Sequence, residues 1–428
     1  MIRILYADGE TRQSIFGQGE DTAAPSEAVA GIIKRVRGEG DAAVLDLTER
    51  YDGCRLETLL VSPQEMDEAM AAVPPEFVDI MRAASRNIRA YHERQVRHGF
   101  LLDDREGLTT GQRMVPIERV GLYVPGGTAA YPSSVLMNAI PAMIAGCPRI
   151  IMATPPGPDG RINAGILAAA QVAGITEVYK MGGAQAVAAM AYGTNSVPRV
   201  DKIVGPGNAW VAEAKRQVYG QVGIDMIAGP SEILIIADGA SDPRHVAADL
   251  LSQAEHDRQA AAVLVTDSEA LAQAVQQEVE RQLVTLPRQD IARASIERNG
   301  KIIVTRDIVE AVDMANRVAP EHLELCVDAP FDLLPRIVNA GSVFLGRWCP
   351  EAMGDYFAGP NHTLPTSGTA RFSSALSVDD FVKKIQFSYY TKEALRREKD
   401  GVALFARMEG LEAHARSALS RFEGEEQP

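Results

Sequence analysis

The sequence has few of the features that mark secreted, membrane-spanning or nucleic-acid-binding proteins. It contains only four cysteines and no C-x-x-C pair, which argues against a disulfide framework and against a cysteine zinc site. No apolar run approaches the roughly 18 residues that a bilayer requires, and the opening M-I-R-I-L-Y-A-D lacks the apolar core of a signal peptide. The net charge of −14 argues against nucleic-acid binding. We therefore expect a cytoplasmic protein with neither a membrane nor a nucleic-acid partner.

The composition, with 46% hydrophobic and 23% charged residues, is typical of a soluble globular protein. A chain of 428 residues is long enough for two or more domains with sizeable cores. The order of the expected elements predicts an N-terminal arm over 1–21, a larger α/β domain over 22–117 plus 232–375, a smaller α/β domain over 118–231, and a helical C-terminal segment over 376–428.

Apolar strands alternate with helices between residues 118 and 231. Such alternation predicts a parallel sheet with helices on both faces. Three of the strands run into glycine-containing turns, at Pro125–Gly127, Gly182–Ala186 and Gly205–Asn208. Turns at the carboxyl ends of parallel strands point backbone N–H groups at one crevice, where phosphates and dinucleotides bind. None of the three has the G-x-G-x-x-G pattern, however, and such turns often only connect elements.

A second α/β pattern follows, beginning with a strand at Ile233–Ala237. Ser241-Asp242-Pro243 marks a helix start, and the helix presents Gln253 and His256 near its end. Residues spaced i, i+3 share a helix face and could hold one metal ion. Glutamine is an uncommon ligand, so an exposed pair without a function is an equally open interpretation.

The stretch from Ala319 to Thr366 gathers acids and histidines between glycines and prolines. It contains A-P-E-H-L-E-L, the apolar run G-S-V-F-L-G, which suits a buried strand, and P-E-A-M-G-D-Y-F-A-G-P-N-H-T-L-P-T. Carboxylates and imidazoles held on loops are what proton transfer and metal binding require. The same residues could also form ordinary surface turns. By contrast, His92 and His98 lie among arginines near the end of a helix that opens at Pro75, and a solvated helix face explains them.

The C-terminal part is predicted to be helical. D-D-F-V-K-K-I-Q-F indicates one helix, and a last helix extends from about Val402 to Phe422. Glu409 and His414 would point about 140° apart on an ideal helix, at 100° per residue. Both reach one site only if Gly410 distorts the turn or the site wraps around the helix.

Taken together, these segments resemble the histidinol dehydrogenase family over nearly the whole chain, from about residue 24 to 420. The resemblance rests on ordered motifs: V-G-L-Y-V-P-G-G, G-G-A-Q-A, D-K-I-V-G-P-G-N, A-G-P-S-E, L-L-S-Q-A-E-H, A-P-E-H-L, G-S-V-F-L-G, G-D-Y-F-A-G-P-N-H-T-L-P-T and E-G-L-E-A-H. It implies two incomplete, doubly wound, Rossmann-like α/β domains with a helical C-terminal dimerisation segment. It also implies the NAD-dependent, four-electron oxidation of L-histidinol to L-histidine through the aldehyde, the last two steps of histidine biosynthesis.

The resemblance further implies one Zn²⁺ per subunit and a homodimer whose active site is shared between subunits. The metal ligands would be Gln253, His256, Asp355 and His414, with His414 supplied by the other subunit. Two imidazoles and a carboxylate suit zinc, and a neutral amide is a weak fourth ligand that leaves room for substrate atoms.

The remaining roles implied by the resemblance divide between proton transfer, substrate and cofactor. His322 matches the general base for the alcohol, and Glu321 matches the group that activates water on the aldehyde. The other substrate-contacting positions are Ser231, His362 and Glu409, and the NAD-contacting positions, one in each glycine turn, are Tyr123, Gln185 and Asn208.

Three other functions are compatible with parts of the pattern. A related zinc- and NAD-dependent enzyme could oxidise another small alcohol, such as a sulfonated diol, although Glu409 and His362 suit a cationic amine and an imidazole better. A zinc hydrolase could use Glu321 to activate water. A non-catalytic module could use zinc only to join a dimer.

Overall fold

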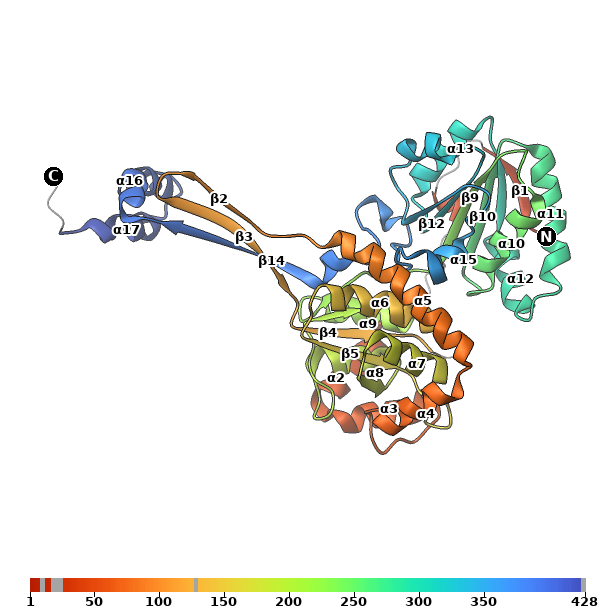
Figure 1. The fold of residues 1–428 in the computed structure, drawn as a ribbon, viewed down its shortest axis with the longest axis horizontal. Helices are drawn as coiled ribbons and strands as arrows, with labels where there is room; N and C mark the ends of the chain where they lie inside the picture. The colour runs from red at the N-terminus through yellow and green to blue at the C-terminus, as the bar shows by residue number, and fades with distance from the viewer. Residues whose placement is uncertain (8–11, 17–25, 127–129, 425–428) are drawn as a thin grey trace. The chain divides into compact units, whose positions relative to one another are not determined.

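The computed structural model describes residues 1–7, 12–16, 26–126 and 130–424. Contacts between α-carbons divide the chain into two compact units. The first unit consists of Met1–Val96 and Ile117–Phe381, and the second of Arg97–Pro116 and Val382–Pro428. Figure 1 shows the helices and strands of the two units.

The first unit contains a six-stranded parallel sheet. Its strands lie in the order β1 (Arg3–Tyr6), β11 (Lys301–Val304), β10 (Ala261–Thr266), β9 (Glu232–Ala237), β12 (His322–Cys326) and β13 (Ser342–Leu345). Every residue of β9 and β10 is buried, as expected of central strands whose sequences are apolar at all but one position each. The strand predicted in G-S-V-F-L-G forms, but at the edge of the sheet, and only Phe344 in it is buried.

Helices cover both faces of this sheet because alternate strand residues point to opposite sides. Ile233 and Ile235 pack with α10 (Pro243–Ala254), α11 (Glu269–Leu283) and α12 (Gln289–Arg298). Leu234 and Ile236 pack on the other side with α1 (Arg12–Phe16) and α13 (Ile308–Val318). The predicted start of α10 is confirmed, since the Asp242 side chain caps it and accepts a hydrogen bond from Arg244 N at 2.8 Å.

The first unit also contains a five-stranded parallel sheet. Its order is β6 (Glu177–Lys180), β5 (Arg149–Thr154), β4 (Arg119–Tyr123), β7 (Lys202–Val204) and β8 (Gly223–Ile224). One face carries α4 (Pro63–Ala72), α5 (Pro75–His92), α6 (Pro132–Ile144) and α7 (Ala164–Ala173). The other face carries α2 (Ser26–Glu39), α3 (Asp41–Asp52), α8 (Gly183–Tyr192) and α9 (Ala209–Val218). The predicted α/β class with parallel sheets is therefore confirmed.

The helices before residue 96 lie differently from the sequence-based division. Residues 22–117 were predicted to belong with 232–375, but α2–α5 pack against the five-stranded sheet. An amphipathic helix reveals which of its faces is buried, as Val29, Ile32, Ile33 and Val36 of α2 do, but it does not reveal the sheet that buries that face. Arg3–Tyr6 of the predicted arm form an edge strand, and residues 8–11 and 17–21 of that arm lie outside the described residues.

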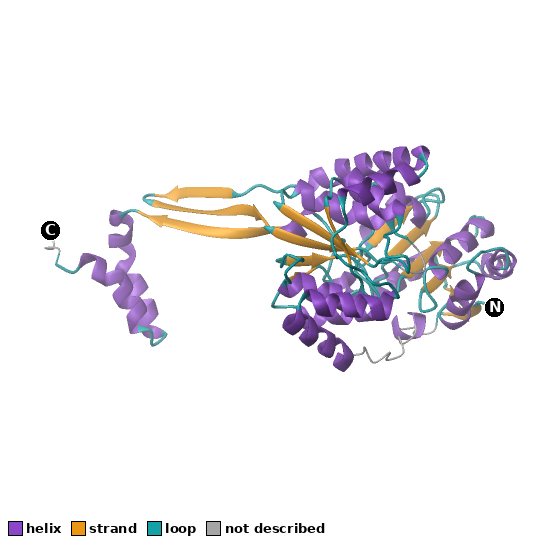
Figure 2. Ribbon diagram, turned by 90° about the horizontal axis from the view of Figure 1, so that it is seen from below, coloured by secondary structure: helices purple, strands orange, loops and turns teal. Residues whose placement is uncertain are grey.

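The second unit combines a three-stranded antiparallel sheet with a pair of helices, as Figure 2 shows. The strands are β2 (Phe100–Arg105), β3 (Leu108–Pro116) and β14 (Val382–Tyr390), and the helices are α16 (Lys392–Met408) and α17 (Glu412–Leu419). The helix predicted in D-D-F-V-K-K-I-Q-F is wrong, because Val382–Tyr390 pairs along its whole length with β3. The prediction of one continuous last helix is also wrong, because the helix is interrupted at Gly410, whose φ is 77°, and α16 and α17 form on either side of it.

Among the described residues, no helix combines the length and the apolar content needed to cross a membrane.

Candidate active site

Glu321 and His322 enter the six-stranded sheet at the amino end of β12. Both side chains are buried and contact the backbone of Glu232, at the start of the neighbouring strand β9. The Glu321 carboxylate accepts a hydrogen bond from Glu232 N at 2.8 Å, and His322 Nδ1 lies 3.0 Å from Glu232 O. A carbonyl oxygen only accepts hydrogen bonds, so Nδ1 carries the imidazole proton and Nε2 carries the lone pair.

The His322 Nε2 atom is buried and has no hydrogen-bond partner among the described residues. Burial lowers the pKa of His322 below its ordinary value, while Asp355 acts in the opposite direction. The imidazole is thus neutral near pH 7 and presents a free acceptor atom. Burial also raises the pKa of Glu321 well above its ordinary value, which makes its carboxylate a stronger proton acceptor than an exposed one.

Two further carboxylates face His322 Nε2 from the segment after β13. Glu351 lies in the short helix α15 (Glu351–Met353), and Asp355 lies in the π-helical turn that follows, Gly354–Ala358. Glu351 Oε1 is 3.5 Å from His322 Nε2, and Asp355 Oδ1 is 3.9 Å from it. Ligand atoms of these three residues lie within 4.8 Å of one another and could hold a metal ion.

A glycine brings this segment close to β13. A Cβ on Gly354 would lie 2.3 Å from the ring of Phe344, so any side chain there would displace the turn. The Phe344 ring in turn lies 6.0 Å from the His322 ring, centroid to centroid. The glycine of the P-E-A-M-G-D motif therefore holds the two carboxylates beside the histidine.

Gln253 and His256 approach the same place from the end of α10. Gln253 is fully buried, and with its amide oriented to satisfy its neighbours it donates to Glu351 Oε1 at 2.7 Å and to Oε2 at 3.1 Å. His256 follows the helix, and its backbone N–H donates to Gln253 O at 3.2 Å. Burial lowers the pKa of His256, and the largest opposing effect is the charge of Asp355. Three of the four predicted ligands, Gln253, His256 and Asp355, therefore lie in the first unit.

The remaining predicted substrate positions divide between the two units. His362 Nδ1 donates to Asp355 O at 3.1 Å, and its Nε2 lies 3.2 Å from Ser134 Oγ at the start of α6. Ser231 directly precedes Glu232, on the end of β9 where Glu321 and His322 lie. Glu409 and His414 are exposed residues of the second unit, at the end of α16 and in α17. The first unit alone thus lacks the fourth predicted ligand.

The predicted cofactor positions lie at the carboxyl ends of strands in the five-stranded sheet. Tyr123 ends β4, is buried, and accepts a hydrogen bond from Gly183 N at 3.0 Å, which joins two of the glycine turns. Its burial raises its pKa to about 12. Gln185 is buried in the first turn of α8, and Asn208 caps α9 by accepting from Trp210 N and Val211 N. Gly127, in the remaining turn, lies outside the described residues.

A buried ion pair holds the turn that contains Asn208. The Lys215 ammonium and the Asp225 carboxylate are in contact, and their side chains are 2% and 1% exposed. Lys215 Nζ donates to Gly205 O at 3.0 Å, and Asp225 accepts from Gly205 N at 2.7 Å. Gly205 has a φ of 120°, and a Cβ on it would lie 2.0 Å from Tyr123 O. Both peptide groups of Gly205 are therefore fixed where only glycine fits.

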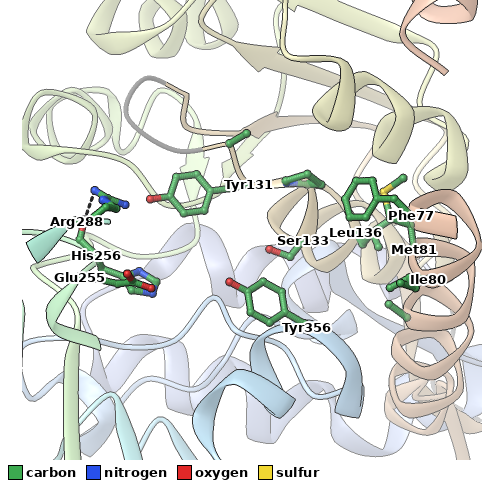
Figure 3. Close-up of a pocket in the computed structure, with 13 residues that line it drawn as sticks. Phe77, Ile80, Met81, Tyr131, Ser133, Leu136, Glu255, His256, Arg288 and Tyr356 are labelled. Carbon is green, nitrogen blue, oxygen red and sulfur yellow. Dashed lines mark hydrogen bonds between the residues drawn. The ribbon is translucent and has the colours of Figure 1, made fainter. Parts of the chain in front are cut away.

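A cavity of about 280 Å³ opens beside His256 (Figure 3). Phe77 and Met81 of α5 and Leu136 of α6 form an apolar wall, while His256 and Tyr356 form a polar one. Arg288 also lines the cavity, and its guanidinium donates to His256 O at 3.4 Å. A small molecule in this cavity would reach the His256 ring.

Sequence reasoning missed two of the buried groups at this site. The motif P-E-A-M-G-D assigns no role to Glu351, although its place four residues before Asp355 in a glycine-containing segment is a usable signal. His92 was assigned to a solvated face, but it is fully buried, with Nδ1 2.7 Å from Gln95 Oε1 and Nε2 3.4 Å from Asn361 Nδ2. His92 thus supports the segment that carries His362, which a local charge pattern does not reveal.

A family model described as histidinol dehydrogenase matches residues 17–422. The histidinol dehydrogenase of Geobacillus kaustophilus is 57% identical over 396 residues, covering 92% of this chain and 93% of that protein. The histidinol dehydrogenase of Listeria monocytogenes serovar 1/2a is 53% identical, covering 99% of this chain and 97% of that protein. The crystal structure of histidinol dehydrogenase from Elizabethkingia anophelis aligns with a TM-score of 0.92 and 38% identity, covering 99% of this chain and 98% of that chain.

Proposed function

Because the chain belongs to the histidinol dehydrogenase family, an NAD-dependent oxidoreductase family, we propose that it oxidises L-histidinol to L-histidine in two steps with one active site. Each step transfers a hydride to one NAD, so the complete reaction consumes two NAD and one water molecule. The observation that best supports this assignment is the buried, proton-free Nε2 of His322 beside the two carboxylates of Glu351 and Asp355.

In the first step His322 Nε2 takes the proton of the substrate hydroxyl while the carbon gives its hydride to NAD. The hydrogen bond from Nδ1 to Glu232 O fixes the required tautomer and stabilises the imidazolium that forms. In the second step Glu321 takes a proton from the water that adds to the aldehyde, and His322 gives its proton to the aldehyde oxygen, so that a neutral hydrate and a neutral imidazole result. His322 then acts as base again while the hydrate loses its second hydride.

We propose that a zinc ion is bound by Gln253, His256 and Asp355, with His414 as the fourth ligand. The residues fit zinc, since imidazole and carboxylate are its ordinary ligands and Asp355 lies among closely grouped donor atoms. When bound, the ion would hold the imidazole and amine nitrogens of histidinol and so keep the aldehyde in place between the two steps. Ser231, His362 and Glu409 contact the substrate in this proposal.

The cofactor contacts of this proposal are Tyr123, Gln185 and Asn208. The N-termini of α8 and α9 are suited to the pyrophosphate of NAD because the helix dipole favours negative charge there. The turns lack the full dinucleotide fingerprint, and a loosely held cofactor suits a reaction in which two NAD molecules must visit one site in turn.

We further propose a homodimer in which each active site receives His414 and Glu409 from the partner subunit. The second unit exposes a set of large apolar side chains, with Leu404 64%, Phe405 70% and Met408 82% exposed on α16. Its strands add Phe100, Leu101 and Leu102, which are also exposed. Large apolar side chains exposed together on one unit indicate an interaction site, and a second copy of this chain is the occupant that completes the metal site. The four free cysteines are consistent with a cytoplasmic setting.

The test is the yield of NADH per histidinol, measured by absorbance with zinc-loaded protein and limiting substrate. Two NADH per histidinol support the proposal. A zinc hydrolase or a binding module would produce none, and an enzyme for another alcohol would respond only to that alcohol; either result overturns the proposed function.

A further inference from the structure

We propose that Glu351 is a positioning residue that orients the amide of Gln253, so that the amide oxygen faces the metal; this inference rests on the proposed function. Glu351 has no assigned part in the reaction as set out above. It is 3% exposed, and its backbone N–H donates to Glu324 Oε1 at 2.7 Å. That bond fixes the backbone of Glu351, and its carboxylate lies between Gln253 and His322.

The orientation of Gln253 is a chemical problem because its amide has two nearly isosteric ends. Only the oxygen has lone pairs to offer a cation, whereas the NH₂ group is a donor. A rotation of the terminal amide by half a turn would replace the ligand atom with N–H groups pointing at the ion. Gln253 is fully buried, so water cannot compensate either end.

The position of Glu351 favours one of the two orientations of the Gln253 amide. Both of its carboxylate oxygens lie within hydrogen-bond distance of one end of the amide, at 2.7 and 3.1 Å. An ionised carboxylate only accepts hydrogen bonds, so an ionised Glu351 places the NH₂ group at that end and turns the amide oxygen the other way. Partners that orient metal ligands in this manner typically change metal affinity by 10- to 100-fold when removed.

A competing role for Glu351 is direct ligation, because its ligand atom groups with those of His322 and Asp355 within 4.8 Å. The two roles differ in what they require of the side chain. A positioning acceptor needs only an oxygen at the right distance, which glutamine supplies. As a direct ligand, glutamine would replace the carboxylate by a neutral amide oxygen, which is the weak kind of ligand that Gln253 already provides.

The experiment compares Glu351→Gln, Glu351→Met and Glu351→Asp in the full-length protein, with Glu213→Gln as control for the loss of a buried carboxylate. Glu213 lies on α9, is 4% exposed and pairs with Arg216 rather than with a proposed metal ligand. The measurements are zinc affinity by competition with a chelator and the visible absorption of the Co²⁺-substituted protein. Thermal unfolding of the metal-free protein reports on folding separately.

We expect Glu351→Met to weaken zinc binding by about 10- to 100-fold and to alter the Co²⁺ spectrum. Glu351→Gln retains an acceptor and should stay within about fivefold of the wild type, the difference between a charged and a neutral acceptor. Glu351→Asp should bind zinc more weakly than Glu351→Gln despite its charge, because its carboxylate is withdrawn from the amide. If Glu351→Met does not fold, the order of zinc affinity between Glu351→Asp and Glu351→Gln still distinguishes a positioning residue from a direct ligand.

Zinc affinity that is equally poor in Glu351→Gln and Glu351→Met would overturn the proposal in favour of direct ligation, and unchanged affinity in Glu351→Met would overturn it outright. Failure of the proposed function would be recognised separately, because the wild-type protein itself would then form no NADH from histidinol, whatever the order of zinc affinities among the variants.

Discussion

His322 donates its Nδ1 proton to the backbone carbonyl of Glu232 across 3.0 Å. The donor comes from the first residue of β12 and the acceptor from the first residue of β9. Because the acceptor is main chain, it cannot titrate or rotate away, so the tautomer of His322 is set by the sheet itself. Glu232 N binds Glu321 in the same way, and one peptide segment thereby positions both groups proposed to transfer protons.

Replacing His322 by Asn should separate proton transfer from substrate binding. The Asn amide keeps an N–H that can donate to Glu232 O but has no basic nitrogen to replace Nε2. We expect kcat to fall by about 10²- to 10⁴-fold, the usual contribution of a general base, with little change in histidinol affinity measured by calorimetry. His98→Asn, at an exposed position, is the control and should leave kcat unchanged. Full activity in His322→Asn would remove His322 from the role of base.

The shared site can be tested by mixing two inactive variants. His414→Asn should lose zinc and substrate binding together, and His322→Asn should lose proton transfer, so neither homodimer is active. After unfolding and refolding in equal amounts, half of the dimers are mixed, and each mixed dimer has one intact site of two if His414 crosses between subunits. Activity should then return to about one quarter of the wild-type value. A mixture that stays inactive, or His414→Asn protein with unchanged zinc content, would contradict the shared ligand.

The buried pair Lys215–Asp225 should control both stability and cofactor affinity. Asp225→Asn leaves the Lys215 ammonium buried without a counter-charge, which typically costs about 3–5 kcal/mol in the free energy of unfolding. It also frees the Gly205 turn, so KM for NAD should rise while KM for histidinol changes little. Urea unfolding and steady-state kinetics measure the two effects.

Two variants separate the loss of stability from the loss of turn geometry. Lys215→Met combined with Asp225→Leu removes both charges, so it should recover stability but not NAD affinity. The control Glu39→Gln, in an exposed ion pair with Arg35, should change neither quantity. Recovery of both properties in the double variant would show that the pair acts only on stability.

Glu324 should make the protein less stable as pH rises. Burial, together with the charge of Asp249, raises the pKa of Glu324 well above 4.5 in the folded state. Between the unfolded and folded pKa values the unfolded chain has lost this proton and the folded chain has kept it. The free energy of unfolding therefore falls with increasing pH, by up to about 1.4 kcal/mol per pH unit.

Glu324→Gln, which cannot titrate, should flatten this part of the stability profile between pH 5 and the folded-state pKa. Urea unfolding of the metal-free protein at a series of pH values measures the slope. Glu49→Gln, at an exposed position of α3, should leave the slope as it is in the wild type. Parallel profiles for Glu324→Gln and the wild type would show that Glu324 does not contribute.

Much of the fold is readable from local sequence because the signals are local. The continuous apolar run I-L-I-I-A specifies a strand buried on both faces, and Ser241-Asp242-Pro243 specifies the start of α10 through a cap and a proline that needs no donor. Three ordered motifs also place Glu321-His322, Gln253 with His256, and Asp355 on loops and element ends. The family resemblance assigned roles to these residues that spacing alone left open.

Other features are decided by partners that lie far away in the chain. Val382–Tyr390 becomes a strand because β3, more than 260 residues earlier, offers a complete antiparallel ladder. His92 is buried because Asn361 and Gln95 satisfy its two ring nitrogens. The free Nε2 of His322 follows from a carbonyl on another strand, and the orientation of Gln253 follows from a carboxylate 98 residues later. The sequence by itself thus determined the elements and the chemical groups, while only the tertiary structure decided which hydrogen bonds remain open, because hydrogen-bond satisfaction depends on neighbours in space and not on neighbours in the chain.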